Sequence, residues 1–213
     1  MDLLIFDLDG TLIDSKRDIV NAVNAARGSL GLGPLDLATV ASYVGNGAPV
    51  LIRKALGPDM PDETVAGALN HFIRFYHANH SVHTVLYPGV REALDVWQAA
   101  GNQLAVLTNK PEKISRAILA GFGLAGHFFR VYGGDSFTEK KPDPVGIVTL
   151  MRESGIGAGR TAMVGDSSVD ILTARNAGVT AYGVSYGFQP ESLIAHPPDV
   201  LVDDMRQLLE RTA

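Results

Sequence analysis

The stretch Leu3-Leu4-Ile5-Phe6-Asp7-Leu8-Asp9-Gly10-Thr11-Leu12 decides the fold of this 213-residue chain. Its first four residues form a continuous apolar run, which is typical of a parallel strand buried on both faces. Asp7 then falls at the carboxyl end of that strand, where open α/β sheets bind their ligands. A second carboxylate at Asp9 repels the first unless a cation or a proton lies between them, and oxygen ligands suit Mg²⁺ best. Taken alone, the same residues also describe an ordinary turn rich in Asp and Gly.

The composition is that of a globular protein, with 46% hydrophobic and 19% charged residues in a chain long enough for one or two domains. The net charge of −5 and the scattered Lys and Arg argue against a nucleic-acid partner. The chain contains no cysteine, which excludes disulfides, thiolate metal sites and a cysteine nucleophile. Neither a signal-peptide pattern nor a membrane-length apolar run is present, so we expect a cytoplasmic protein with no membrane partner.

Residues 15–83 show helical patterns and no strand pattern. Ser15 is available as a helix N-cap before the first pattern, and further helices are expected at about 36–44, 48–56 and 62–79. Such an all-helical stretch after a single strand indicates an insertion. We therefore expect a helical cap domain at 15–83, inserted into a catalytic core formed by residues 1–14 and 84–213.

The rest of the chain alternates strands with helices. Apolar runs predict strands at 103–107, 128–132, 161–164, 179–184 and 199–202, with a closing helix at about 204–211. This alternation is typical of the α/β class, with a doubly wound, mostly parallel sheet of Rossmann-like form.

Three predicted strands end in polar residues of complementary kind: Asp7 with Asp9, Thr108 with Asn109, and Asp166. In a parallel sheet these ends face the same crevice. A Mg²⁺ ion held by carboxylates can bind an anion there, while Thr108 and a lysine of the Lys140-Lys141 pair add hydrogen bonds and positive charge. The pattern predicts a phosphoryl-binding site.

Four segments in order resemble the signature motifs of the haloacid dehalogenase-like (HAD) hydrolases: Asp7-Leu8-Asp9-Gly10-Thr11-Leu12, Thr108-Asn109-Lys110, Lys141-Pro142-Asp143-Pro144 and Gly165-Asp166-Ser167-Ser168-Val169-Asp170. The resemblance covers essentially the whole chain, including the helical insert, which is similar to the cap domain of that family. Within the family the chain is most similar to the phosphoglycolate phosphatases, through Tyr43-Val44-Gly45-Asn46-Gly47-Ala48, Tyr87-Pro88-Gly89-Val90 and the segment after Gly165.

The resemblance implies a role for each motif residue. Asp7 would attack phosphorus and form a transient aspartyl-phosphate, while Asp9 would act as general acid and base and ligate Mg²⁺ through its backbone carbonyl. Thr108, Asn109 and Lys141 would bind the phosphoryl group. Asp166 would be a further protein ligand of Mg²⁺, and Asp170 would either ligate it through water or support the other ligands.

Each of these residues also has a plainer interpretation. Asp170 fits a capping box that begins at Ser167, and both roles can coexist. Thr108 also fits a strand-end turn. The lysine pair also fits a solvated surface, and only Lys141 matches the position of the family.

In the cap, the resemblance makes Asn46, Gly47 and Arg53 candidate substrate contacts, because Arg binds a carboxylate with two parallel hydrogen bonds. A surface arginine on an amphipathic helix is the alternative. The histidines at 71, 77, 80 and 83 match no metal-binding spacing.

The leading hypothesis is a Mg²⁺-dependent phosphatase for a small organic phosphate ester, with 2-phosphoglycolate as first candidate, acting as a monomer or homodimer. The alternatives are a sugar phosphomutase similar to beta-phosphoglucomutase, a phosphatase for another sugar phosphate, and, more remotely, a receiver-like module that stores a phosphoryl group. The large helical insert and the Asp-x-Asp pair argue against a receiver.

Overall fold

The computed structural model describes residues 1–212, which form two compact units. The first contains Met1–Asp14 together with the chain from Leu86 onward, and the second is Ser15–Val85. Each unit has its own buried side chains, so each is described by itself. None of the helices among residues 1–212 is long and apolar enough to cross a membrane.

A six-stranded parallel sheet forms the centre of the first unit. Its strands lie in the order β5 (Arg130–Tyr132), β4 (Gln103–Leu107), β1 (Leu3–Phe6), β6 (Thr161–Gly165), β7 (Thr180–Val184) and β8 (Val200–Val202). The predicted α/β class and parallel sheet are confirmed. The apolar stretch that opens the chain is a central strand, with every residue buried.

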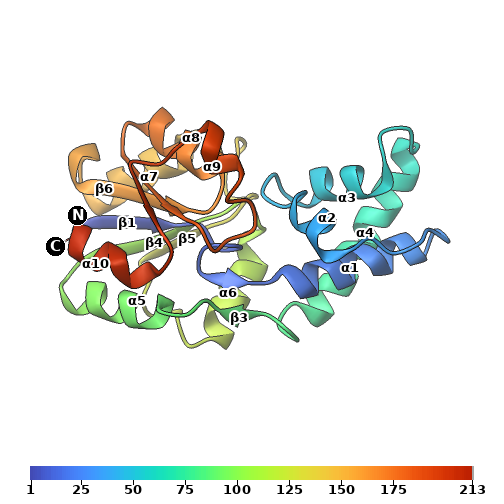
Figure 1. The fold of residues 1–213 in the computed structure, drawn as a ribbon, viewed down its shortest axis with the longest axis horizontal. Coiled ribbons are helices and arrows are strands. Elements are labelled where there is room, and N and C mark those ends of the chain that lie inside the picture. The colour runs from blue at the N-terminus through green and yellow to red at the C-terminus, as the bar shows by residue number, and fades with distance from the viewer. Residues whose placement is uncertain (213) are drawn as a thin grey trace. The chain divides into compact units, whose positions relative to one another are not determined.

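Helices cover both faces of this sheet (Figure 1). They are α5 (Val90–Ala99), α6 (Glu112–Gly121), α7 (Val145–Ser154), α8 (Ser168–Ala177), α9 (Ser192–Ala195) and α10 (Leu209–Thr212), with short 3₁₀ turns at Ala158–Arg160 and Met205–Leu208. Leu3 and Ile5 pack into the core with Ile147 of α7 and Ile171 of α8. Because successive side chains of a strand point to opposite faces of the sheet, Phe6 points away from Ile5. It packs against Trp97 of α5, with ring centroids 5.4 Å apart. Alternate residues of β1 thus pack into the apolar cores on the two faces of the sheet.

The second unit is helical, as the apolar spacing predicts, with α1 (Lys16–Gly28), α2 (Leu37–Ala41), α3 (Ala48–Leu56) and α4 (Asp62–Asn79). Asp18, in the first turn of α1, is 2% exposed. Its carboxylate accepts hydrogen bonds from the backbone amides of His83 and Thr84, at 2.9–3.0 Å, and from the Thr84 hydroxyl at 2.7 Å. This buried acid therefore ties the beginning of the unit to its end.

The structure departs from the predicted elements at several ends. Ser15 stands at the N-cap of α1, but its hydroxyl makes no capping hydrogen bond. Two short strands, β2 (Ile13–Asp14) and β3 (Val85–Leu86), pair in a small second sheet that the apolar pattern does not predict. The strand predicted from residue 128 begins at Arg130, since Phe128 instead packs against Phe6 at 6.4 Å between centroids.

Candidate active site

The candidate active site lies where β1, β4 and β6 end. These strands are neighbours in register, with Phe6 paired to Val106 on one side and to Val164 on the other. Asp7 and Thr108 follow β1 and β4 directly, and Asp166 follows β6. The sheet therefore brings together polar residues from three distant parts of the sequence.

Three buried carboxylates form an acidic cluster there: Asp7, Asp166 and Asp170. Each offers an oxygen, and these oxygens lie within 4.8 Å of one another. Among residues 1–212 this is the one group of three or more acidic, His or Cys side chains arranged so that they could hold a metal ion. We refer to these three residues as the acidic cluster.

Burial and mutual repulsion strongly raise the pKa values of two of these acids, Asp7 and Asp166. Desolvation, opposed by the charge of Lys141 and helped by that of Asp170, raises the pKa of Asp7 to about 6. Desolvation likewise raises the pKa of Asp166 to about 8, again helped by the charges of Asp170 and Asp7. Without a cation the cluster therefore retains a proton near neutral pH, mainly on Asp166, and a bound cation would displace it.

Glycines line the acidic cluster closely. A Cβ at Gly10, whose φ is +85°, would lie 2.3 Å from a carboxylate oxygen of Asp166, and a Cβ at Gly187 would lie 2.2 Å from the Cβ of Asp166. A Cβ at Gly165 would lie 2.2 Å from Asp170. These distances are far below van der Waals contact, so no side chain fits at these positions without moving the carboxylates.

The Asp166 carboxylate is held by the loop after β7. Its Oδ2 accepts hydrogen bonds from the backbone amides of Phe188, at 2.6 Å, and Gln189, at 3.4 Å. Thr11 donates to Oδ1 at 3.4 Å. Backbone donors from a separate loop thus fix this carboxylate, and sequence reasoning gave no sign of that loop.

Lys141 is the buried member of the lysine pair, whereas Lys140 is exposed. Its ammonium lies 2.6 Å from Asp170 Oδ1 and 3.0 Å from Asp7 Oδ1. Burial alone lowers the pKa of Lys141, but the charges of Asp170 and Asp7 outweigh it and raise the pKa overall. The lysine is therefore a fixed positive charge inside the cluster.

Asn109 holds the backbone of the Lys141 loop. Its side-chain amide donates to the Lys141 carbonyl and its side-chain oxygen accepts from the Lys141 amide, both at 3.1 Å. Both carboxylate oxygens of Asp170 also have hydrogen-bond partners. Its Oδ1 accepts from Lys141, and its Oδ2 accepts from the amide and the hydroxyl of Ser167, at 3.2 and 2.7 Å. The capping interaction and the contact with Lys141 therefore coexist at Asp170.

The Asp9 side chain has a partner that the sequence interpretation did not single out. The ammonium of Lys110 donates to both Asp9 carboxylate oxygens, at 2.8 and 2.9 Å. The available signal was its place directly after Thr108-Asn109 in the second motif.

The acidic cluster fits a divalent cation. Asp7 Oδ1 is buried and, apart from the ion pair with the Lys141 ammonium at 3.0 Å, has no hydrogen-bond donor among residues 1–212. Counted with Asp9, four carboxylates face two ammonium groups, which leaves a formal charge of −2 when all are ionised. Hard oxygen donors with excess negative charge are what Mg²⁺ prefers.

The predicted cap residues lie in the second unit. Asn46 is exposed, and Gly47 is the N-cap of α3 with φ +84°. Arg53, on α3, donates to the Met60 carbonyl at 2.5 Å and forms an ion pair with Asp62. Within its own unit the Arg53 guanidinium is therefore engaged, and its contact with substrate stays a prediction.

Two tyrosine rings pack against each other in a tilted arrangement. The rings of Tyr87 and Tyr186 have centroids 4.5 Å apart, and Tyr186 donates to the Thr11 carbonyl at 3.0 Å. The Tyr87 hydroxyl is buried without a hydrogen-bond partner in the described part of the chain. Burial and the nearby carboxylates, first Asp14 and then Asp166, raise the pKa of Tyr87 beyond its ordinary value.

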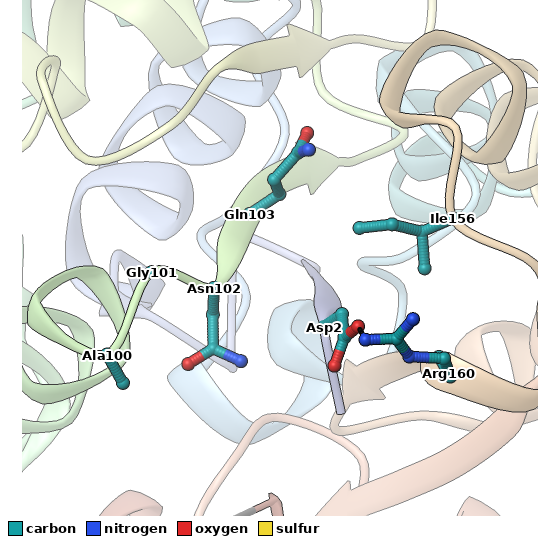
Figure 2. A pocket seen from close by; sticks show the side chains of 7 residues that line it. All are labelled: Asp2, Ala100, Gly101, Asn102, Gln103, Ile156 and Arg160. Carbon is teal, nitrogen blue, oxygen red and sulfur yellow. Dashed lines mark ion pairs between the residues drawn. The ribbon is translucent and has the colours of Figure 1, made fainter.

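A pocket of about 320 Å³ lies at the other end of the sheet, before β1, β4 and β6 (Figure 2). Asp2 and Arg160 form an ion pair across it, and Asn102 and Gln103 line it. It contains none of the predicted site residues. The carboxyl ends of the strands, where the acidic cluster lies, therefore remain the candidate active site.

Comparison with known proteins agrees with this geometry. Residues 4–184 match the family described as haloacid dehalogenase-like hydrolase. The chain is 41% identical over 213 residues to the phosphoglycolate phosphatase of Pseudomonas fluorescens (strain Pf0-1), covering 97% of this chain and 78% of that protein. It is also 41% identical to the phosphoglycolate phosphatase of Vibrio vulnificus (strain YJ016), covering 98% and 94%.

A solved structure is similar over its full length. The crystal structure of a predicted phosphoglycolate phosphatase from Haemophilus somnus 129PT superposes with a TM-score of 0.95 at 32% identity, covering 100% of this chain and 98% of that one. Fold, motif residues and relatives thus agree, and the chain belongs to the haloacid dehalogenase-like hydrolases, among the members that hydrolyse phosphoric monoesters.

Proposed function

We propose that this enzyme hydrolyses 2-phosphoglycolate with Mg²⁺ through an aspartyl-phosphate on Asp7. The observation that carries the proposal is Asp7 Oδ1, a buried oxygen of the acidic cluster whose one close cation in residues 1–212 is the Lys141 ammonium, and which has no further hydrogen-bond donor there. An oxygen left without a donor is available to a cation or an electrophile. The names of the relatives from Pseudomonas and Vibrio supply the substrate.

The chemistry consists of two displacements at phosphorus. In the first, an Asp7 oxygen attacks, the bond from phosphorus to the ester oxygen breaks, and Asp9 gives its proton to the departing glycolate oxygen. In the second, water attacks phosphorus, the bond to Asp7 breaks, and Asp9 takes up a proton from the water. The products are glycolate and phosphate, and both aspartates return to their starting state.

The remaining motif residues hold the reacting groups. Thr108 and Lys141 would bind the phosphoryl oxygens, since both are buried, Thr108 follows the strand next to that of Asp7, and the Lys141 ammonium lies 3.0 Å from Asp7. Asn109 fixes the Lys141 backbone, so we expect any phosphate contact of its own to come from its backbone amide. In phosphoryl transfer, most of the rate enhancement comes from hydrogen-bond donors and charges that are already in position to stabilise the transition state.

Mg²⁺ would be held by Asp7, Asp166 and the Asp9 carbonyl, and it would supply positive charge against the phosphoryl oxygens. Both Asp170 oxygens already have partners in Lys141 and Ser167. We therefore propose that Asp170 supports the site rather than ligating the ion directly. The cytoplasmic location and the monomer or homodimer state stay predictions.

The test is phosphate release from 2-phosphoglycolate, compared with glucose 1-phosphate, glucose 6-phosphate, nucleotides and pyrophosphate, each with Mg²⁺ and with EDTA. We expect kcat/KM for 2-phosphoglycolate to exceed the others by about tenfold or more, a difference of about 1.4 kcal/mol in transition-state stabilisation, and to vanish in EDTA. Glucose 1-phosphate converted to an isomer without phosphate release would instead favour the mutase. An enzyme that leaves the whole panel intact would contradict the proposal.

A further inference from the structure

Lys110 is a buried cation to which the proposed chemistry gives no task. Its side chain is 6% exposed, and the Asp9 side chain that it contacts is 11% exposed. Lys110 and Lys141 are the two lysines buried among residues 1–212. Lys141 forms ion pairs with Asp7 and Asp170, whereas Lys110 forms an ion pair with Asp9. The two ammonium groups therefore serve different parts of the site.

The backbone of Lys110 is fixed, so its ammonium has a defined position. Its amide donates to Thr108 Oγ1 at 3.3 Å, and its carbonyl accepts from the amide of Gly134 at 2.9 Å. A Cβ at Gly133 would lie 2.7 Å from the same carbonyl oxygen, so the neighbouring loop packs tightly on it. The lysine is thus anchored beside the phosphate-binding Thr108 and reaches from there to Asp9.

The position of Asp9 defines where the leaving group must lie. To protonate the ester oxygen, Asp9 must come within hydrogen-bond distance of it, about 2.6–3.2 Å. The Lys110 ammonium, 2.8–2.9 Å from the Asp9 oxygens, is therefore close to the place that the leaving group must take. In 2-phosphoglycolate a single carbon separates the ester oxygen from the carboxylate.

We propose that Lys110 determines specificity by binding the carboxylate of the substrate, in place of the Asp9 carboxylate that it holds in this structure. The proposal rests on the proposed function and adds the residue that selects the substrate. The exchange replaces one carboxylate partner by another, so the buried ammonium keeps an ion pair, and Asp9 turns to the ester oxygen. A phosphate ester without an acid beside the ester carbon offers no such exchange.

This assignment places a main source of selectivity in the first unit rather than in the helical one. Arg53, the cap candidate for the same carboxylate, is already bound to Asp62 and Met60 within its unit. The Lys110 ammonium already pairs with a carboxylate at a buried position, and the substrate carboxylate would take the place of that partner. Specificity for an anionic leaving group would then survive changes at Arg53 better than changes at Lys110.

The experiment compares 2-phosphoglycolate with ethyl phosphate, which has the same ester carbon and no carboxylate. Wild type, Lys110→Met and the control Lys113→Met are assayed on both with Mg²⁺; Lys113 is an exposed lysine of α6. We expect Lys110→Met to lower kcat/KM for 2-phosphoglycolate by about 50-fold or more, and for ethyl phosphate by about fivefold or less, because only one substrate loses a buried ion pair. Lys113→Met should leave the ratio of the two values unchanged.

Equal losses on both substrates would overturn the proposal, because Lys110 would then only position Asp9. Lys110→Gln, which keeps a hydrogen-bond donor without the charge, is measured alongside and must show the same loss of preference, so a failure of the Met variant to fold leaves the test intact. If wild type itself shows no preference for 2-phosphoglycolate, the proposed function fails. A preference retained in both Lys110 variants refutes the role of Lys110 alone.

Discussion

The two units of this chain bury charge in opposite ways. The first unit buries three acids and two lysines close together at the ends of its strands, and one acidic oxygen, Asp7 Oδ1, has no hydrogen-bond donor in the described residues. The second unit buries a single charged residue, Asp18, whose carboxylate accepts hydrogen bonds from three donors. A buried charge that is fully hydrogen-bonded stabilises a fold, whereas an incompletely bonded one is available for chemistry.

The largest expected effect comes from replacing the incompletely bonded acid. Asp7→Asn keeps the shape of the side chain but removes the nucleophile, so we expect kcat to fall by at least about 10⁴-fold. Phosphate release at saturating substrate measures the loss. The melting temperature should stay near that of wild type, because the loss of the ion pair with Lys141 is offset by the removal of a desolvated charge that Asp170 repels. Substantial turnover in a folded Asp7→Asn enzyme would refute the mechanism.

The fully bonded acid should matter for stability instead. Asp18→Ala leaves the backbone amides of His83 and Thr84 without their acceptor, while the Thr84 hydroxyl keeps the His80 carbonyl, so we expect the free energy of unfolding to fall by about 2–4 kcal/mol. Urea unfolding measures it. Asp59→Ala removes an exposed acid of the same unit and should change the free energy by less than about 0.5 kcal/mol. Similar values for the two variants would remove the contrast between the units.

The pH dependence of metal binding sharpens the comparison. The pKa of Asp166 is about 8, against an ordinary value of 3.8, so between these pH values the metal-free folded protein holds a proton that the unfolded chain has lost. The free energy of unfolding then decreases as pH rises, by at most about 1.4 kcal/mol per pH unit from this group. Mg²⁺ replaces the proton, so it should raise the melting temperature more at about pH 8.5 than at about pH 6.

The control for that measurement is Asp166→Asn, which should lose most of the extra stabilisation by Mg²⁺ at high pH. Thermal unfolding in EDTA and in Mg²⁺ at the two pH values measures both proteins. A larger Mg²⁺ effect at the lower pH would contradict the coupling between proton and metal.

The smallest effect is expected at Tyr87 and Tyr186, whose rings pack against each other. Tyr186→Phe removes a hydrogen bond to the Thr11 carbonyl and should lower the free energy of unfolding by about 1 kcal/mol. Tyr87→Phe removes a buried hydroxyl that has no partner in residues 1–212, so it should leave the free energy unchanged or raise it by up to about 1 kcal/mol. Urea unfolding of the two variants is the measurement. A larger loss for Tyr87→Phe would indicate a partner such as bound substrate or water.

The sequence predicts the first unit well because its signals are local. A continuous apolar run identifies β1 as buried on both faces, and polar residues directly after a strand mark the crevice. The closing helix near 204–211 is less accurate, since the structure has a 3₁₀ turn at Met205–Leu208 before α10. There Asp204 accepts from the Arg206 amide, which favours the tighter turn.

What sequence reasoning missed depends on distant partners. Lys110 is buried because it meets Asp9, which is 101 positions away, and Asp18 is buried because it meets residues 65 and 66 positions away. Alone, each looks like an ordinary surface charge in the first turn of a helix or beside a loop. No spacing rule within one element predicts such a pair. A structure is needed to show which charges are inside.

The hydrogen bonds of Asp18 to His83 and Thr84 also have a consequence for how this chain can be rearranged. They fasten the two ends of a segment of about 70 residues to each other, so the segment enters and leaves at one place. For the first unit, such an insertion acts like a short turn between its two parts. Folding of the first unit therefore largely avoids the entropy cost of closing a long flexible loop. The helical unit is therefore suited to exchange as a cassette, transplanted between related enzymes with Asp18 and Thr84 kept together.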